Sequence, residues 1–187
     1  MRKSSNCIDE VIRNRRTVHN FIPDRMPPRQ DLERALQHAV CAPNHYATEP
    51  WHFYLLGPST VEQICILNSE MMRAARGDKA AEIKLRRWRE IPGWLLMTCT
   101  RSDETVKFME DYAACSCAAQ NLMLSLWDAG IGVKWSTGDV TREPEFYRIT
   151  GVDPQRESVV GIFWYGYPQE VPDTPRKEIT GKLTELA

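Results

Sequence analysis

The sequence predicts an α+β fold formed by a single domain over residues 1–187. Segments with helical and strand periodicity alternate loosely along the chain, without repeats, low-complexity tracts or linkers. One long helical segment carries more apolar surface than one small sheet could cover, which indicates a helix–sheet layer or a dimer interface. A chain of 187 residues is long enough to bury a substantial core.

In the first third of the chain, the sequence pattern predicts two helices followed by a strand. Asn6 is a plausible cap for a helix that ends near Arg15. The segment 27–43 is the clearest amphipathic helix, because its apolar residues share one face and prolines flank it. Residues 51–57 are short, rich in aromatic side chains and closed by Gly-Pro, which is typical of a strand.

The middle third predicts two helices, a strand and a long helix. A capping box that begins at Ser59 opens a helix that weakens at Gly77, and residues 79–90 follow as a surface helix. Residues 94–100 have the pattern of a buried strand, and about 103–129 form the long helix. The apolar stripe predicted for that helix consists of Met109, Tyr112, Ala113, Cys117, Gln120, Met123, Leu124 and Trp127.

The last third predicts two strands, a short helix and an extended tail. Residues 132–138 resemble a short strand that runs into a loop, and 143–149 a brief helix. Residues 158–168 have the pattern of a buried strand. The polar, proline-punctuated segment 171–187 is expected to be extended.

The overall charge argues against nucleic acid and membrane partners. Lysine plus arginine, 24 residues, nearly cancels aspartate plus glutamate, 25 residues. No apolar run approaches the roughly 18 residues of a membrane span, and the first residues lack the apolar centre of a signal peptide. We therefore expect a cytoplasmic protein.

The six cysteines are scattered and are expected to be reduced packing residues. Only Cys115 and Cys117 are close in sequence. On a helix their side chains would point about 200° apart, which suits neither a disulfide nor a shared metal ion.

The first candidate site is Arg15-Arg16-Thr17, just past the end of the first helix. Guanidinium groups and a hydroxyl suit the oxygens of a phosphate monoester. Cations at a helix C-terminus are also favoured by its dipole without any ligand, so this motif alone leaves both interpretations open.

The second candidate is the loop that contains Pro43, Asn44 and His45, between a strong helix and a strand. Loops held by rigid elements on both sides commonly bind ligands, although a lone histidine is more often a surface or capping residue. Two further segments are candidates: 135–137 (Trp-Ser-Thr) and 176–177 (Arg-Lys). Each is weak evidence for a site on its own, because Ser and Thr are common in turns and Arg-Lys in a polar tail is usually solvated.

Several common motifs are missing from the sequence. There is no GxGxxG after a strand, no phosphate-binding P-loop, no HExxH or paired Cys-x-x-Cys, and no Gly-x-Ser-x-Gly elbow. These absences argue against Rossmann dinucleotide binding, a P-loop enzyme, a zinc site and an α/β-hydrolase. Trp88, Trp94 and Trp127 lie in helix or strand patterns without a continuous basic groove, so they are interpreted as packing residues.

The order of the weak motifs is more informative than any one of them. Arg-Arg-Thr follows the first helix, Ala-Pro and Pro-Trp-His-Phe follow the second, Trp-Ser-Thr-Gly follows a glycine-rich turn, and Gly-Tyr-Pro precedes Pro-Arg-Lys. In this order, and over essentially the whole chain, the sequence resembles the compact members of the nitroreductase family.

The resemblance implies a nitroreductase-like sandwich, with a central, mostly antiparallel sheet flanked by helices and the long helix at a homodimer interface. It also implies two FMN sites that are built from both subunits, with NAD(P)H as the electron donor. The family's flavin-binding positions fall on Arg15, Arg16, Thr17, Pro43, Asn44, His45, Trp135, Ser136, Thr137, Arg176 and Lys177.

The resemblance assigns different parts of the flavin to these groups. The first three residues, helped by Arg176 or Lys177, would hold the phosphate and ribityl chain, and the loop 43–45 would approach the flavin of the partner. Segment 135–137 would line the flavin from below. Residues 125–130 correspond to positions assigned to the nicotinamide donor. No single cation in residues 71–90 aligns with those that the family places near the flavin pyrimidine, and Lys84 is only a guess for that position.

The sequence departs from the family pattern in one loop. The larger family tends to Pro-Ser-x-x-Asn-x-Gln-Pro-Trp, whereas this chain has Asn44, Ala47 and Glu49 at the serine, asparagine and glutamine positions. Loss of the asparagine removes a polar flavin contact, which predicts an altered potential or acceptor choice.

The activity implied is ping-pong electron transfer from NAD(P)H through FMN to a small organic acceptor such as a nitroaromatic or quinone. No side chain is assigned as a catalytic acid, although His45 could supply a proton. Two alternatives stay open: another flavin reaction on the same fold, such as dehydrogenation or dehalogenation, and a non-catalytic flavin-binding dimer.

Overall fold

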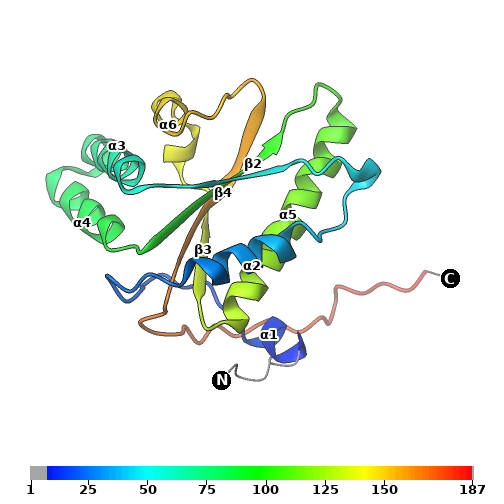
Figure 1. Cartoon of the computed structure of the whole chain (residues 1–187). Helices are drawn as coiled ribbons and strands as arrows, with labels where there is room; N and C mark the ends of the chain where they lie inside the picture. Colours follow the sequence, from blue (N-terminus) through cyan, green and yellow to red (C-terminus); the bar gives the residue numbers. More distant parts are fainter. Residues whose placement is uncertain (1–7, 187) are drawn as a thin grey trace.

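The structure, a computed structural model that describes residues 8–186, is built around one antiparallel sheet with helices on both faces (Figure 1). The spatial order of the strands is β1-β2-β4-β3. Their bounds are Trp51–Leu55 for β1, Gly93–Thr100 for β2, Gly132–Ser136 for β3 and Glu157–Gly166 for β4. The predicted α+β class and antiparallel sheet are confirmed.

One face of the sheet is covered by α2 (Arg29–Ala39) and α5 (Thr105–Asp128). The short α1 (Ile8–Asn14) lies against the C-terminal half of α5, where Ile8 lines a shallow groove with Leu124. The residues at the centre of this core are apolar and almost completely buried, and include Ala35, Met97, Ala118, Leu122 and Phe163.

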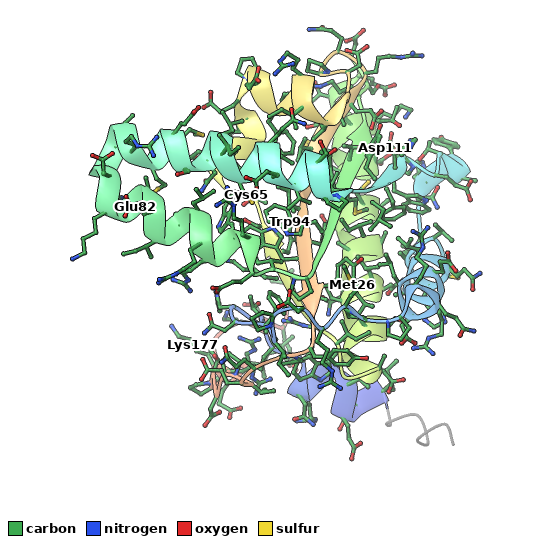
Figure 2. All side chains as sticks on the ribbon, turned by 60° about the vertical axis from the view of Figure 1, so that its left-hand side comes forward. Met26, Cys65, Glu82, Trp94, Asp111 and Lys177 are labelled. Atoms are coloured by element: carbon green, nitrogen blue, oxygen red, sulfur yellow. The ribbon has the colours of Figure 1, made fainter. Side chains whose placement is uncertain are left out.

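The opposite face is covered by α3 (Pro58–Arg76), α4 (Asp78–Arg89) and α6 (Pro144–Thr150). The chain passes from α3 to α4 at Gly77, whose φ of 82° favours glycine. Figure 2 shows Cys65 and Trp94 between the two helices and the sheet.

Three indole rings form the aromatic centre of this second core. Trp88, Trp94 and Trp164 meet edge to face, with ring centroids 5.0 to 5.5 Å apart. This geometry is the preferred one for aromatic pairs. The interpretation of Trp88 and Trp94 as packing residues is therefore confirmed.

The apolar stripe predicted on α5 is wrong as a single surface. Met123 is buried against the sheet, but Met109 is 66% exposed, and Ala113 and Cys117 are exposed as well. Cys115 is buried while Cys117 is exposed, so the two thiols point to different sides of the helix as expected. The helix thus has a core face and a second, outward face with apolar character.

Two expected helix starts differ from the structure or lie outside it. The capping box at Ser59 does not form, because α3 begins one residue earlier with Pro58 at its first position and has no side-chain cap. Glu62, the box's acidic member, instead pairs with Arg89 of α4. The expected cap Asn6 lies outside the described residues.

Candidate functional site

The segment that follows α1 lies along the free edge of the sheet. Thr17 forms a parallel bridge with Val133 of β3, and the backbone N–H of Val18 donates to the carbonyl of Val133 at 3.1 Å. A Cβ on Gly132 would lie 2.4 Å from Val18, so glycine is required for this close approach. The pairing with β3 therefore holds the backbone of Thr17 and Val18 against the edge of the sheet.

Three arginines gather at one end of this segment. The pKa of Arg15 is lowered by burial and then by the nearby charges of Arg176 and Arg16. Arg16 donates to the carbonyls of Arg13 and Arg15, while its Nε is buried without a hydrogen-bond partner. Among residues 8–186, no carboxylate forms an ion pair with any of these three arginines. The structure thus brings together Arg15, Arg16 and Arg176 of the predicted phosphate site.

Four further basic side chains lie near the other end of the segment: His19, Lys84, Arg87 and Lys134. Burial lowers the pKa of each lysine and of His19, and the charges of the neighbouring cations lower these pKa values further. We call this group the second basic cluster.

The second basic cluster is partly supported by the aromatic core beneath it. The ammonium of Lys84 lies 5.1 Å from the ring centre of Trp88, and that of Lys134 lies 4.8 Å from that of Trp164. None of its members has an ion pair with a carboxylate in the described part of the chain. Lys84 and Lys134 are half-buried, whereas His19 and Arg87 are exposed. Half-buried lysines without ion pairs favour an anionic ligand.

The sequence interpretation identified only Lys84 of the second basic cluster. His19, Arg87 and Lys134 come from a loop, a helix and a strand that are far apart in sequence, so no local motif marks them. His19 follows Arg15 by four residues, which span about 13 Å in an extended chain. The two basic groups therefore form one strip along the sheet edge.

The predicted residues Trp135, Ser136 and Thr137 lie at the end of β3. The indole N–H of Trp135 donates to the carbonyl of Val160 at 2.9 Å, and its ring stacks on Phe163 at 5.3 Å. A Cβ on Gly161 would lie 2.3 Å from the indole nitrogen, so the missing side chain leaves room for the ring. The indole is fixed, whereas Thr137 is exposed beyond the strand.

The loop with Pro43, Asn44 and His45 has an unusual backbone. Tyr46, Ala47 and Glu49 have φ values of 55°, 49° and 44°, in the left-handed region. This region costs a non-glycine residue about 1 kcal/mol or more. Asn44 stabilises the turn, because its Oδ1 accepts a 2.9 Å hydrogen bond from the backbone N–H of Glu49.

Within one subunit this loop lies far from the arginine group. Thr48 is hydrogen-bonded to Asp111, near the beginning of α5, whereas α1 packs beside Leu124. Asp111 and Leu124 are thirteen positions apart, which corresponds to about 20 Å of helix. The two regions are also well separated in Figure 1. The structure does not bring Pro43, Asn44 and His45 together with Arg15 in a single chain.

The remaining predicted positions lie in the tail and at the end of α5. Lys177 is exposed on the extended tail, in the region labelled in Figure 2. Ser125 lies 2.8 Å from Nδ1 of His38, so its hydroxyl contacts α2. No helix in the described residues is long and apolar enough to cross a membrane.

Comparison with known proteins identifies relatives along the whole chain. Residues 12–167 match the nitroreductase family model. The chain is 29% identical to the "Putative NAD(P)H nitroreductase YfhC" of Bacillus subtilis over 95% of this chain and 93% of that protein. The solved nitroreductase-like family protein from Bacillus cereus is 30% identical, with a TM-score of 0.85 and coverage of 100% and 99% of the two chains.

More distant structures share the fold alone. Oxidized iodotyrosine deiodinase bound to FMN and 3-iodo-L-tyrosine has a TM-score of 0.77 at 22% identity, with 96% of this chain and 100% of that chain covered. The architecture is therefore the α+β sandwich common to these proteins. The chain belongs to the nitroreductase family.

Proposed function

We propose that this protein is an FMN-dependent oxidoreductase that acts as a homodimer and transfers electrons from NAD(P)H to a small organic acceptor. The observation that carries the proposal is the basic strip along the edge of β3, which lacks carboxylate counter-ions in the described residues. An elongated ligand with a phosphate at one end and a ring that becomes anionic on reduction matches this distribution of charge.

The residues of the strip fit FMN at both ends. Arg15, Arg16 and Arg176 would hold the phosphate. The second basic cluster would face the flavin ring, where cations stabilise negative charge that develops on reduction. Thr17 adds a hydroxyl donor between the two ends, and Thr137 adds one just past the end of β3.

When bound, FMN would supply the redox chemistry by accepting a hydride from NAD(P)H and passing electrons to the acceptor. The protein's own residues bind and orient the ligand. Lys134 and Arg87 would stabilise the reduced, anionic ring because they are already held close together by β3 and α4. His45, which is exposed on its loop, would be available to donate a proton to the acceptor.

The proposed homodimer explains why the loop 43–45 and the arginine group are separated in one chain. A two-fold axis near the outward face of α5 would bring the loop of one subunit to the strip of the other. Apolar side chains exposed on α5 and on the tail support such an interface: Val106, Met109, Ile179, Leu183 and Leu186.

The test is anaerobic reduction of the purified protein reconstituted with FMN. Addition of NADH or NADPH should bleach the flavin band near 450 nm, and a quinone or nitroaromatic should restore it. Initial rates should follow ping-pong kinetics. Bound flavin that no nicotinamide reduces would instead favour a non-catalytic flavin-binding dimer, and a protein that takes up no FMN would contradict the proposal.

A further inference from the structure

A buried carboxylate lies directly beneath the strained loop. Asp111 of α5 is only 2% exposed, and its Oδ1 accepts a 2.6 Å hydrogen bond from the hydroxyl of Thr48. Its second oxygen lies 2.5 Å from the ammonium of Lys107, one turn earlier on the helix. Both carboxylate oxygens are therefore engaged, one by the loop and one by its own helix.

We propose that Asp111 is a positioning residue that orients the loop 43–49, so that Asn44 and His45 reach the flavin bound by the partner subunit. This inference rests on the function proposed above. Asp111 itself does not contact the ligand in this arrangement. It acts through Thr48, which immediately precedes Glu49 in the strained part of the loop.

The conformation of the loop needs restraint from outside. Three of its residues have left-handed backbone, a conformation that persists only where surrounding structure holds it. Burial does not supply that restraint, because His45 is exposed and Tyr46 is 87% exposed. The bond between Asn44 and Glu49 closes the loop on itself, and the two bonds from Thr100 to the carbonyl of Pro50 anchor the end of the loop rather than its centre.

The hydrogen bond from Thr48 to Asp111 sets the orientation of the loop relative to α5. An ionised carboxylate only accepts, so the hydroxyl of Thr48 must be the donor, and a bond to a charged acceptor is stronger than one between neutral groups. Asp111 belongs to the rigid α5, whose outward face is the proposed interface. The bond therefore links the loop to the element around which the two subunits would pair.

The test removes the donor and then restores it. Thr48→Val is close in shape but cannot donate, whereas Thr48→Ser keeps the hydroxyl. We expect Thr48→Val to speed amide hydrogen exchange in residues 44–49 of the FMN-free protein by about tenfold and to weaken FMN binding about tenfold. Thr48→Ser should resemble the wild type in both measurements.

The matched control is Thr105→Val, which changes an exposed threonine on the same helix as Asp111. It should alter neither loop exchange nor FMN affinity. Asp111→Ala provides a second variant: it removes the acceptor and should loosen the loop, and combining it with Thr48→Val should add little to loop exchange, because both changes remove the same hydrogen bond.

The measurements distinguish failure of the proposed function from failure of the proposed role of Asp111. A wild-type protein that binds no FMN contradicts the proposed function. Unchanged loop exchange and unchanged FMN affinity in Thr48→Val would overturn the role of Asp111, as would loss of FMN binding in Thr48→Ser equal to that in Thr48→Val. A general loss of stability is recognised separately, because it would raise exchange throughout α5 as well as in the loop.

Discussion

Arg15 and Arg176 are held close together although one follows the first helix and the other lies in the tail. Burial and the charge of Arg176 both lower the pKa of Arg15. Arg15 is half-buried whereas Arg176 is exposed, and a half-buried charge beside a like charge is unfavourable unless an anion joins them. The proximity of Arg176 to Arg15 connects the tail to the proposed phosphate site.

Replacing Arg15 should weaken FMN binding selectively. For Arg15→Gln we expect the FMN dissociation constant to rise about 10- to 100-fold, because a charged hydrogen bond to phosphate contributes about 1.5–3 kcal/mol. Riboflavin, which has no phosphate, should bind both proteins equally. Fluorescence titration with the two flavins measures the difference.

The control for this change is Arg13→Gln. The side chain of Arg13 is exposed on α1 and pairs with Asp9 at 2.9 Å, and only its backbone carbonyl, which the substitution keeps, contacts Arg16. Its replacement should leave FMN affinity within about twofold of the wild type. Equal weakening of FMN and riboflavin in Arg15→Gln would argue against a phosphate site at this position.

Replacing Lys134 should affect the flavin ring rather than the phosphate. For Lys134→Gln we expect the reduction potential of bound FMN to fall by about 30 mV, equivalent to ~1.4 kcal/mol for two electrons. The FMN-free protein should become slightly more stable, because repulsion from Lys84 and Arg87 is relieved. Lys79→Gln, an exposed lysine on α4, is the matched control. An unchanged reduction potential of FMN in Lys134→Gln would show that the flavin ring does not bind near Lys134.

The stability of the FMN-free protein should depend on pH through His19. Burial, Lys134 and Arg87 lower the pKa of His19 from its usual value of 6.5. Between the lowered pKa and about 6.5 the unfolded chain binds more protons than the folded one, so the free energy of unfolding rises with pH. His19→Asn should flatten the part of this rise that lies below about pH 6.5 in urea unfolding. An identical slope in both proteins would show that other groups dominate.

Disrupting the outward face of α5 should separate the subunits and release FMN together. Ala113 is exposed on this face, and Ala113→Arg would place a charge at the proposed interface. Size-exclusion chromatography with absorbance detection should show a colourless monomer. Glu82→Arg, on the exposed surface of α4, should remain a yellow dimer. A monomer of Ala113→Arg that retains FMN would contradict a shared site.

The sequence predicted most helices and strands because their apolar periodicity is local. It misplaced the start of α3, where proline at the first helical position determines the boundary and Glu62 pairs with α4 instead of capping. It also treated Met109 and Met123 as one stripe, because periodicity does not distinguish a side chain in the core from one on an outward apolar face.

The candidate site was only partly predictable for a similar reason. Arg15 and Arg16 stand in a recognisable order with later motifs, whereas Lys134 is an ordinary strand residue until the fold brings Lys84 and Arg87 beside it. The left-handed backbone of the loop and its bond to Asp111 are likewise tertiary features, since nothing near Thr48 in the sequence indicates its partner.

The central claim is that each flavin site combines the strip of one subunit with the loop of the other. It can be tested with mixed dimers that pair an Arg15→Gln, Arg16→Gln subunit with an Asn44→Asp, His45→Asp subunit, each of which alone should bind no FMN. Shared sites predict that every mixed dimer retains one intact site and binds one FMN that NAD(P)H bleaches. Mixed dimers that bind no FMN would contradict the account, because they would show that each site lies within one subunit.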